Sequence, residues 1–386
     1  MTTNYDRHNK WFGLAGLVLA GLLLVACAGI GQGPPGGGSS ASLTPPPTVT
    51  GPKAFVLNAL GNTVSVIDTV NNTVVATVTV GTSPVAAVLL PSGAKLYVAN
   101  LGSDNVTVIN PATNAVITTI AVGDGPVALR ALPNSTRVYV VNENSNNVSV
   151  IDTTTDTVAA TVPVGDTPVA LAVLSDNSRV YVVNALDNTL SVIAASTNTV
   201  TSTLPVGLEP VDVAATPGGS KVYVANRISN DVTVILTSND TVDATLPLPG
   251  AIAPNVVAVT PDGTRAYVLN FTSANVSVID TAGDTVVATI NVLSGPLAVT
   301  FSPNSATAFV VLPLDDIVTT IDVGTSSLQV NIVVGDEPNS IALTAAAVRG
   351  FVTNGESDNV SVIDPNAAAV VATVAVGDGP FFVVLQ

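Results

Sequence analysis

The chain has very few of the side chains that carry out most enzyme chemistry. Its only histidine is His8, its only tryptophan is Trp11 and its only cysteine is Cys27. The rest of its 386 residues therefore hold no Ser–His or Cys–His nucleophile, no histidine ligand for zinc or iron, and no attachment motif for c-type haem. A single cysteine also excludes an intramolecular disulfide, so the fold has to be stabilised by its core.

Charged residues are scarce and mostly acidic. They make up 10% of the chain, with 27 Asp and Glu against 11 Lys and Arg, which gives a net charge of −16 at pH 7. A nucleic-acid-binding protein needs a basic face for the phosphates, so this balance argues against that class. The mean hydropathy of +0.56 would suit a membrane protein. After residue 50, however, the apolar runs of four to eight residues are too short for membrane-spanning helices and suit buried strands.

The first 52 residues differ in composition from the rest. Residues 1–26 have a charged start followed by an apolar run, which is typical of an export signal; an uncleaved membrane anchor is the alternative. The end of this run, LVAC at 24–27, resembles the lipobox of bacterial lipoproteins. The resemblance implies cleavage before Cys27 and acylation of its thiol, which would anchor the protein to a membrane. Gly, Ser and Pro dominate residues 27–52, so we expect a disordered tether there.

Residues 53–386 consist of a repeated unit of about 42 residues. Each unit has short runs rich in Val, Ile and Thr, separated by turns rich in Asn, Asp, Gly and Pro, and such runs are typical of β-strands. The clearest landmark is an aromatic residue followed by Val: FVLN (55–58), YVAN (97–100), YVVN (139–142), YVVN (181–184), YVAN (223–226), YVLN (267–270), FVVL (309–312) and FVTN (351–354). The spacing is 42 except for one interval of 44, whose two extra residues fall in 247–255.

We name the four strands of a unit A, B, C and D. Strand B carries the aromatic residue, C is the VSVID-like run, D is the VVATVPV-like run, and A follows a Gly-x-x-Pro turn. The repeats begin with a B strand at Lys53 and end with an A strand, PFFVVL at 380–385. In a closed ring this last strand can complete the first sheet and remove its open edge. The sequence therefore predicts an all-β, eight-bladed β-propeller of four-stranded antiparallel blades over 53–386, with seven blades as the alternative.

The repeated segments also resemble a known family. TVSVID, together with TNTVVATIPVG-like and SPDGxxxYV-like runs, is similar to the YVTN-type β-propeller repeat of bacterial and archaeal surface proteins, whose members often have seven blades. Lactonase-type propellers and haem d1 domains have a similar repeat, but the axial histidine of the haem d1 domains has no counterpart here. The tryptophan motifs of eight-bladed quinoprotein dehydrogenases are absent too.

One rim of the propeller is expected to be structural. The aromatic residues should pack between neighbouring blades rather than bind a ligand. Seven units have a basic residue two positions before the aromatic residue, and antiparallel pairing places it beside the end of strand C. This arrangement predicts four cross-strand ion pairs: Lys53–Asp68, Arg137–Asp152, Arg265–Asp280 and Arg349–Asp364. Lys95 and Arg179 have no acid at the paired position.

The opposite rim carries the B–C loops and the D–A loops, and we call it the loop face. Fourteen acids fall there against one basic residue, Arg227. The first loop residue after strand B also varies most between units, which is how a constant scaffold presents a binding surface. An acidic rim that only aids solubility is the alternative. The candidate binding residues are Asp104, Asp124, Asp166, Asp187, Glu209, Arg227, Phe271, Asp336, Glu337 and Asp378.

These features lead to two hypotheses about function. The first is an extracytoplasmic lipoprotein, anchored through Cys27 to the outer membrane or cell surface, whose monomeric propeller binds a protein or polymer through the loop face without catalysis. A cationic partner would fit the acidic charge, and no cofactor is expected. The second is a lactonase-like hydrolase that uses rim carboxylates around Ca²⁺. No D-x-D-x-D-G calcium loop occurs in the chain.

Overall fold

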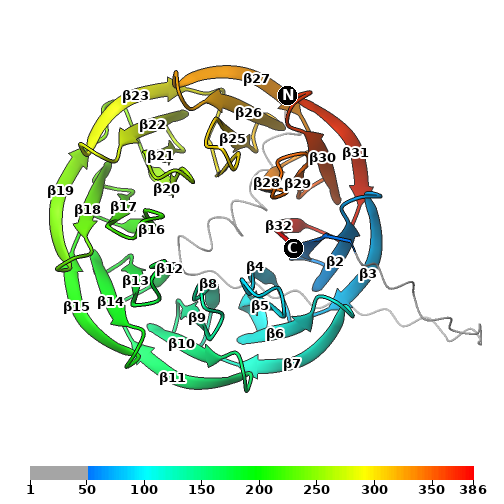
Figure 1. Ribbon diagram of the computed structural model, residues 1–386, viewed down its shortest axis with the longest axis horizontal. Helices are drawn as coiled ribbons and strands as arrows, with labels where there is room; N and C mark the ends of the chain where they lie inside the picture. Colours follow the sequence, from blue (N-terminus) through cyan, green and yellow to red (C-terminus); the bar gives the residue numbers. More distant parts are fainter. Residues whose placement is uncertain (1–50) are drawn as a thin grey trace, which may run out of the picture. The chain divides into compact units, whose positions relative to one another are not determined.

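Thirty-two strands follow one another over residues 51–386, the part of the chain that the computed structural model describes. They form eight four-stranded antiparallel sheets arranged as blades around an axis (Figure 1). The helix of this part is a single 3₁₀ turn, η1 (Leu101–Ser103), and no helix in it is long and apolar enough to cross a membrane. The predicted eight-bladed β-propeller is therefore confirmed. The proposed signal, Cys27 and the tether up to residue 50 lie outside the described residues.

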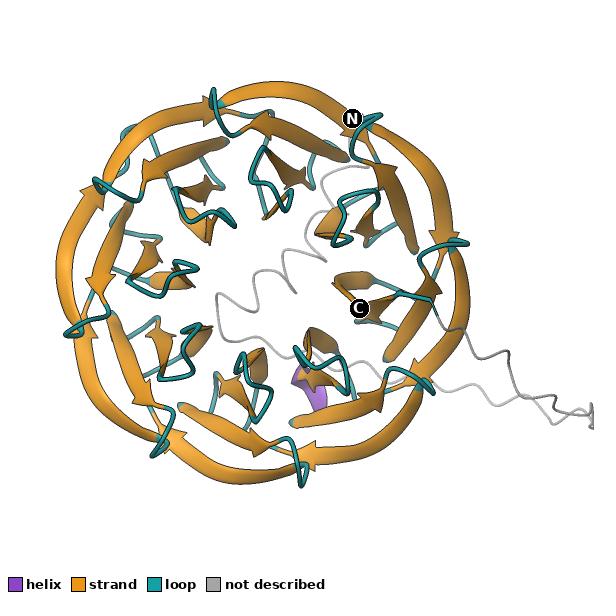
Figure 2. Cartoon of the chain, viewed as in Figure 1, coloured by secondary structure: helices purple, strands orange, loops and turns teal. Residues whose placement is uncertain are grey.

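The strands of each blade run from the axis outward in the order A, B, C, D (Figure 1), and Figure 2 shows the short loops that join them. The A strands are β4 (Pro84–Leu89), β8 (Pro126–Ala131), β12 (Pro168–Val173), β16 (Pro210–Ala215), β20 (Pro254–Val259), β24 (Ala298–Phe301), β28 (Pro338–Leu343) and β32 (Pro380–Leu385). The B strands are β1 (Lys53–Asn58), β5 (Leu96–Asn100), β9 (Arg137–Asn142), β13 (Arg179–Asn184), β17 (Lys221–Asn226), β21 (Arg265–Asn270), β25 (Thr307–Leu312) and β29 (Gly350–Asn354).

The two outer strands complete each blade. The C strands are β2 (Thr63–Asp68), β6 (Asn105–Asn110), β10 (Asn147–Asp152), β14 (Thr189–Ala194), β18 (Asp231–Leu236), β22 (Asn275–Asp280), β26 (Ile317–Asp322) and β30 (Asn359–Asp364). The D strands are β3 (Thr73–Thr79), β7 (Ala115–Ala121), β11 (Thr157–Pro163), β15 (Thr199–Pro205), β19 (Thr241–Pro247), β23 (Thr285–Asn291), β27 (Ser327–Val333) and β31 (Ala369–Ala375). Blade 1 contains β1–β3 and β32, and blades 2 to 8 each contain four consecutive strands.

Burial explains the apolar runs. In β9, RVYVVN, every residue except Arg137 is buried, because both faces of the sheet pack against neighbouring blades. In the outer strand β11 exposed and less exposed residues alternate, as expected for a strand with one face in solvent. The aromatic residues of the B strands are at most 1% exposed. Tyr97 of blade 2, for example, shares a core cluster with Leu129 and Val138 of blade 3, so the predicted packing role is confirmed.

The ring closes as expected from its ends. The last strand, β32, pairs antiparallel with β1, with Val383 opposite Val56 and Leu385 opposite Ala54. Blade 1 therefore joins the first and last segments of the propeller in one sheet, in the order β3-β2-β1-β32. This pairing leaves no open inner edge on β1.

The Asn that ends most B strands holds the loop that follows. In blade 1, Nδ2 of Asn58 donates hydrogen bonds to Oγ1 of Thr63 and Oγ of Ser65, both at 2.9 Å. Equivalent contacts recur at Asn100, Asn142, Asn184, Asn226, Asn270 and Asn354. The repeated Asn thus stabilises the start of each loop on the loop face, except in blade 7, where Leu312 takes its place.

Candidate functional site

A repeated hydrogen bond fixes each B–C loop to the D–A loop that follows it in the chain. The B–C loop residue has a left-handed backbone, as in Asp104 with φ of 51°, and its side-chain oxygen accepts a hydrogen bond from a backbone N–H. The bond joins Asn62 to Ser83, Asp104 to Gly125, Asn146 to Thr167, Asn188 to Glu209, Asn230 to Ala253, Asp316 to Glu337 and Asp358 to Gly379. Asp104, Asp316 and Asp358 therefore have a structural role that Asn fulfils in four other blades.

Asp187 and Asp166 take part in a second set of loop contacts. Oδ2 of Asp187 accepts a 2.8 Å hydrogen bond from the backbone N–H of Asp166, a role that Ser103 has towards Thr82. Oδ1 of Asp166 in turn accepts a 2.9 Å bond from Nδ2 of Asn146. The candidate Asp187 is thus also a structural acceptor.

The single basic residue of the loop face is paired. Arg227 donates through Nη2 to Oε1 of Glu209, and its backbone N–H bonds to the carbonyl of Glu209 at 2.8 Å. Neither residue is therefore available as an isolated charge. Phe271 occupies the same repeat position as Arg227 one blade further on, and its ring lies against Gly295, where a Cβ would be 2.7 Å from a ring carbon.

Four acids of the face have exposed side chains at equivalent places in the D–A loops: Asp124, Asp166, Asp336 and Asp378. Oδ1 of Asp124 accepts a bond from Nδ2 of Asn144 at 3.0 Å. The backbone carbonyl of Asp378 accepts a 3.0 Å bond from the N–H of Gly61, and the residue is exposed. These four acids can meet an incoming partner directly.

A buried acid on this face was not among the candidate residues. Glu143 follows Asn142 at the variable position and is only 8% exposed. Its backbone N–H bonds to the carbonyl of Gly125 at 2.8 Å, whereas its carboxyl has no ion pair within residues 51–386. Burial raises the pKa of this carboxyl to about 7. The sequence signal was a Glu at a position where two other units have Ala.

Two charged residues on A strands were also missed. Arg130 on β8 is exposed although it belongs to an inner strand. At the equivalent position the other blades have uncharged residues: Val88, Ala172, Ala214, Ala258, Thr300, Ala342 and Val384. Asp212 on β16 accepts a 2.9 Å hydrogen bond from the backbone N–H of Val257. Burial raises the pKa of Asp212 to about 6, and the charge of Arg130 opposes that rise. Charges within apolar A-strand runs were the signal for both residues.

The opposite rim has three of the four predicted cross-strand ion pairs. Arg137–Asp152, Arg265–Asp280 and Arg349–Asp364 are confirmed, with N–O distances of 2.7, 2.8 and 3.3 Å. The Lys53–Asp68 pair is wrong. Nζ of Lys53 instead donates to the carbonyl of Pro111 at 2.6 Å and to Oδ1 of Asn114 at 2.9 Å in the next blade, while Asp68 accepts bonds from its own turn.

Lys95 and Arg179, which have no acid at the paired position of their own blade, use acids of the next blade instead. Lys95 pairs with Asp156 at 2.7 Å and Arg179 with Asp240 at 3.1 Å. Each partner lies in the C–D turn of the next blade, as does Asp284, which pairs with Lys221 at 2.5 Å. This rim therefore carries ion pairs within and between blades, although in blade 7 Thr307 takes the place of the basic residue.

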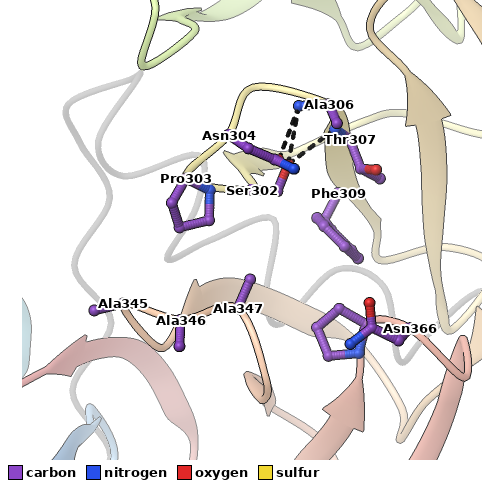
Figure 3. Close-up of a pocket in the computed structure, with 11 residues that line it drawn as sticks. Ser302, Pro303, Asn304, Ala306, Thr307, Phe309, Ala345, Ala346, Ala347 and Asn366 are labelled. Carbon is purple, nitrogen blue, oxygen red and sulfur yellow. Dashed lines mark hydrogen bonds between the residues drawn. The ribbon is translucent and has the colours of Figure 1, made fainter.

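A hollow of about 290 Å³ lies on this rim between blades 7 and 8 (Figure 3). Its walls come from the β24–β25 turn, including Ser302 and Asn304, and from residues 345–347 and 365–366. Oγ of Ser302 accepts bonds from the N–H groups of Ala306 and Thr307. All of its lining side chains are uncharged, so the hollow offers no group for acid–base catalysis. Among residues 51–386, no cluster of three or more His, Cys, Asp or Glu is arranged to hold a metal ion.

The fold and its two faces define a β-propeller with a structural, ion-paired rim and an acidic loop face. The chain belongs to the lactonase, seven-bladed β-propeller family, whose profile matches residues 53–246, half of the chain. Its eight blades depart from the seven in that description. No curated protein sequence matches the chain.

Solved structures share the fold at low identity. Dihydro-heme d1 dehydrogenase NirN in complex with DHE has a TM-score of 0.76 and 17% identity, over 86% of this chain and 74% of that one. Apo AztD from Citrobacter koseri has a TM-score of 0.71 and 14% identity, over 88% and 98%. Hydrazine synthase from Kuenenia stuttgartiensis has a TM-score of 0.62 and 21% identity, over 73% and 95%. At these identities the likeness concerns the fold alone.

Proposed function

We propose that the propeller is a non-catalytic binding module whose loop face recognises a cationic protein or polymer. The observation that carries this proposal is the difference in charge between the two faces. Fourteen acids lie on the loop face, and its single basic residue, Arg227, is paired with Glu209. On the opposite rim, by contrast, basic residues accompany the acids in a band of ion pairs. A concentrated field of one sign attracts partners of the other sign and weakens with salt.

We further propose that the protein is an extracytoplasmic lipoprotein. The support is the sequence alone: a charged and apolar start, LVAC ending at Cys27, and a Gly-, Ser- and Pro-rich stretch up to residue 52. A tether of this kind would let the propeller reach partners away from the membrane surface.

The charge proposal is tested with the full chain and a fluorescent oligolysine peptide. The quadruple variant Asp124→Asn, Asp166→Asn, Asp336→Asn, Asp378→Asn removes four exposed charges. Each Asn still has a side-chain oxygen that can accept a hydrogen bond. The matched control replaces Asp152, Asp176, Asp322 and Asp364 on the opposite rim by Asn. We expect the first variant to bind about tenfold more weakly at low salt and the control to bind like the wild type. Equal affinities for both variants would contradict the proposal.

Lactone hydrolysis is a second candidate function, supported by the family match over residues 53–246. Two carboxyls have pKa values near neutrality, about 7 for Glu143 and about 6 for Asp212, and such groups can act as acid or base at physiological pH. A pH-stat assay with simple lactones tests this candidate. Activity that Glu143→Gln or Asp212→Asn abolishes, without a fall in the melting temperature, would favour catalysis over binding alone.

A further inference from the structure

Six large apolar side chains project from the loop face over blades 4 to 7. Their exposed fractions range from 43% for Leu314 to 71% for Leu186. Three belong to D–A loops and three to B–C loops, and we call them the apolar arc: Leu186, Leu208, Ile228, Ile252, Leu293 and Leu314. Single exposed leucines are common on protein surfaces, but a run of them on successive loops is not.

Backbone contacts show that the middle of the arc is continuous. The N–H of Ile228 bonds to the carbonyl of Leu208 at 3.1 Å. The same B–C loop continues to Asn230, whose Oδ1 accepts from the N–H of Ala253 at 2.8 Å, and this D–A loop contains Ile252. Ile252 in turn donates its N–H to Oγ of Ser273 in blade 6 at 2.9 Å. The apolar side chains therefore lie on loops that touch one another from blade 4 to blade 6.

At the D–A loop position of Leu208 and Ile252, the other blades have polar residues: Thr82, Asp124, Asp166, Ser294, Asp336 and Asp378. The loop face therefore has two parts. Its acidic part covers blades 7, 8 and 1 to 4, and the apolar arc over blades 4 to 7 connects the two ends of the acidic part. Leu60 is exposed too, but it lies in blade 1, away from the arc.

The ends of the arc are acidic. Asp166 and Asp187 lie beside Leu186, and Asp315 and Asp316 follow Leu314 directly. Within the arc, the charge of Arg227 is paired with Glu209. A surface with an apolar centre and acidic ends is complementary to a segment with apolar side chains on one side and Lys or Arg around them. An anionic membrane surface would be repelled by the same acids.

We infer that the apolar arc docks a basic amphipathic segment of a partner protein, with its apolar side chains on Leu208, Ile228 and Ile252 and its basic side chains towards the flanking acids. This inference rests on the proposed function, because it names the chemistry of the cationic partner. It adds that part of the affinity comes from apolar burial and persists when salt screens the charges.

The test compares two synthetic peptides on the full chain by fluorescence anisotropy. One is an amphipathic Lys/Leu peptide, and the other has Ser in place of Leu at the same length and charge. The arc variant is Leu208→Ser, Ile228→Ser, Ile252→Ser; a second is Leu186→Ser, Leu293→Ser, Leu314→Ser. The control, Val116→Ser, Ile117→Ser, Val287→Ser, changes exposed apolar residues of the outer D strands. All of these side chains are exposed, so the variants should fold, and thermal melts verify this.

We expect the Lys/Leu peptide to bind the wild type about 10- to 100-fold more tightly than the Lys/Ser peptide. Either arc variant should remove most of that difference without weakening the binding of the Lys/Ser peptide. The control variant should bind both peptides like the wild type. If both peptides bind equally and the arc variants have no effect, the inference is wrong but the proposed function stands. If neither peptide binds, the proposed function itself fails. Arc-dependent binding to phosphatidylglycerol vesicles without binding to the peptide would replace the inference by a membrane contact.

Discussion

The hydroxyl of Tyr181 donates a 2.6 Å hydrogen bond to Oδ1 of Asp240 in the next blade. Arg179 donates to the same carboxylate oxygen at 3.1 Å. Tyr97 and Tyr223 make equivalent 2.6 Å bonds to Asp156 and Asp284. The aromatic residue is therefore both a core residue and a polar link that fastens neighbouring blades at the rim opposite the loop face.

Removal of one such hydroxyl should destabilise the ring. Tyr181→Phe leaves the partly buried carboxylate of Asp240 with one donor fewer, and we expect the free energy of unfolding to fall by about 1–3 kcal/mol. Tyr267→Phe is the matched control, because the buried hydroxyl of Tyr267 has no hydrogen-bond partner in the described part of the chain. It should be neutral or slightly stabilising. Denaturant melts of both variants decide the point, and equal losses would show that the Tyr181 bond has no net value.

Glu143 should make stability depend on pH in a specific direction. Burial raises the pKa of this carboxyl from 4.5 to about 7 in the folded protein. At a pH between these two values, the folded state therefore keeps a proton that the unfolded chain has released. The contribution of the neutral Glu143 carboxyl to stability is complete below the pKa of the unfolded chain and is lost as the pH rises through the pKa of the folded state. Glu143→Gln cannot ionise, so it should become more stable than the wild type as pH rises, by about 3 kcal/mol above pH 7.

Melting temperatures across this pH range test the Glu143 prediction. The exposed Glu356 lies in another B–C loop, and Glu356→Gln removes one charge from the same face without changing a buried group. Its stability should follow that of the wild type at every pH. If the Glu143→Gln and wild-type curves also stay parallel, the carboxyl is not buried as described.

The sequence was sufficient to predict the fold, because the spacing of the repeat reflects which neighbouring strands pair. The 42-residue spacing and the split first sheet predicted eight blades and the β1–β32 closure, and both depend on strand order alone. Register within one sheet also gave the Arg137–Asp152 pair. Contacts between blades were missed, since they depend on how the sheets are stacked. The units of Lys95, Arg179 and Lys221 lack an acid at the end of their own C strand and use one from the next blade.

The loop face was harder to predict for a related reason. Charge alone marked Asp104 and Asp187 as binding residues, although both accept structural hydrogen bonds. The exchange of Asp104 with Asn at 62, 146, 188 and 230 was a readable sign of an acceptor role. Nothing in the spacing indicated that Glu143 would be buried, because its burial depends on the packing of neighbouring loops.

Membrane attachment should depend on one thiol. Cys27 lies outside residues 51–386, and the prediction comes from the sequence LVAC. Cys27→Ala removes the single cysteine, so the protein should stay as a precursor or lose its lipid, and it should no longer partition into the detergent phase after signal cleavage. Metabolic labelling with a fatty acid gives an independent measurement. A cleaved Cys27→Ala protein that partitions like the wild type would show that lipidation at Cys27 is not the anchor.

The closing strand should be essential to the whole ring. Deletion of 380–386 removes β32, exposes the inner edge of β1 and uncovers Val56 and its neighbours in blade 1, where Val383 is 4% exposed. An open, apolar strand edge pairs readily with other chains, so we expect a large fall in the melting temperature together with aggregation. Deletion of Gln386 alone is the control, because it removes one terminal hydrogen bond, from its N–H to the carbonyl of Lys53 at 2.9 Å, and leaves β32 whole. Thermal melts with light scattering separate the two cases. If the longer deletion melts like the full chain and stays monomeric, the seven remaining complete blades hold the ring without closure by β32.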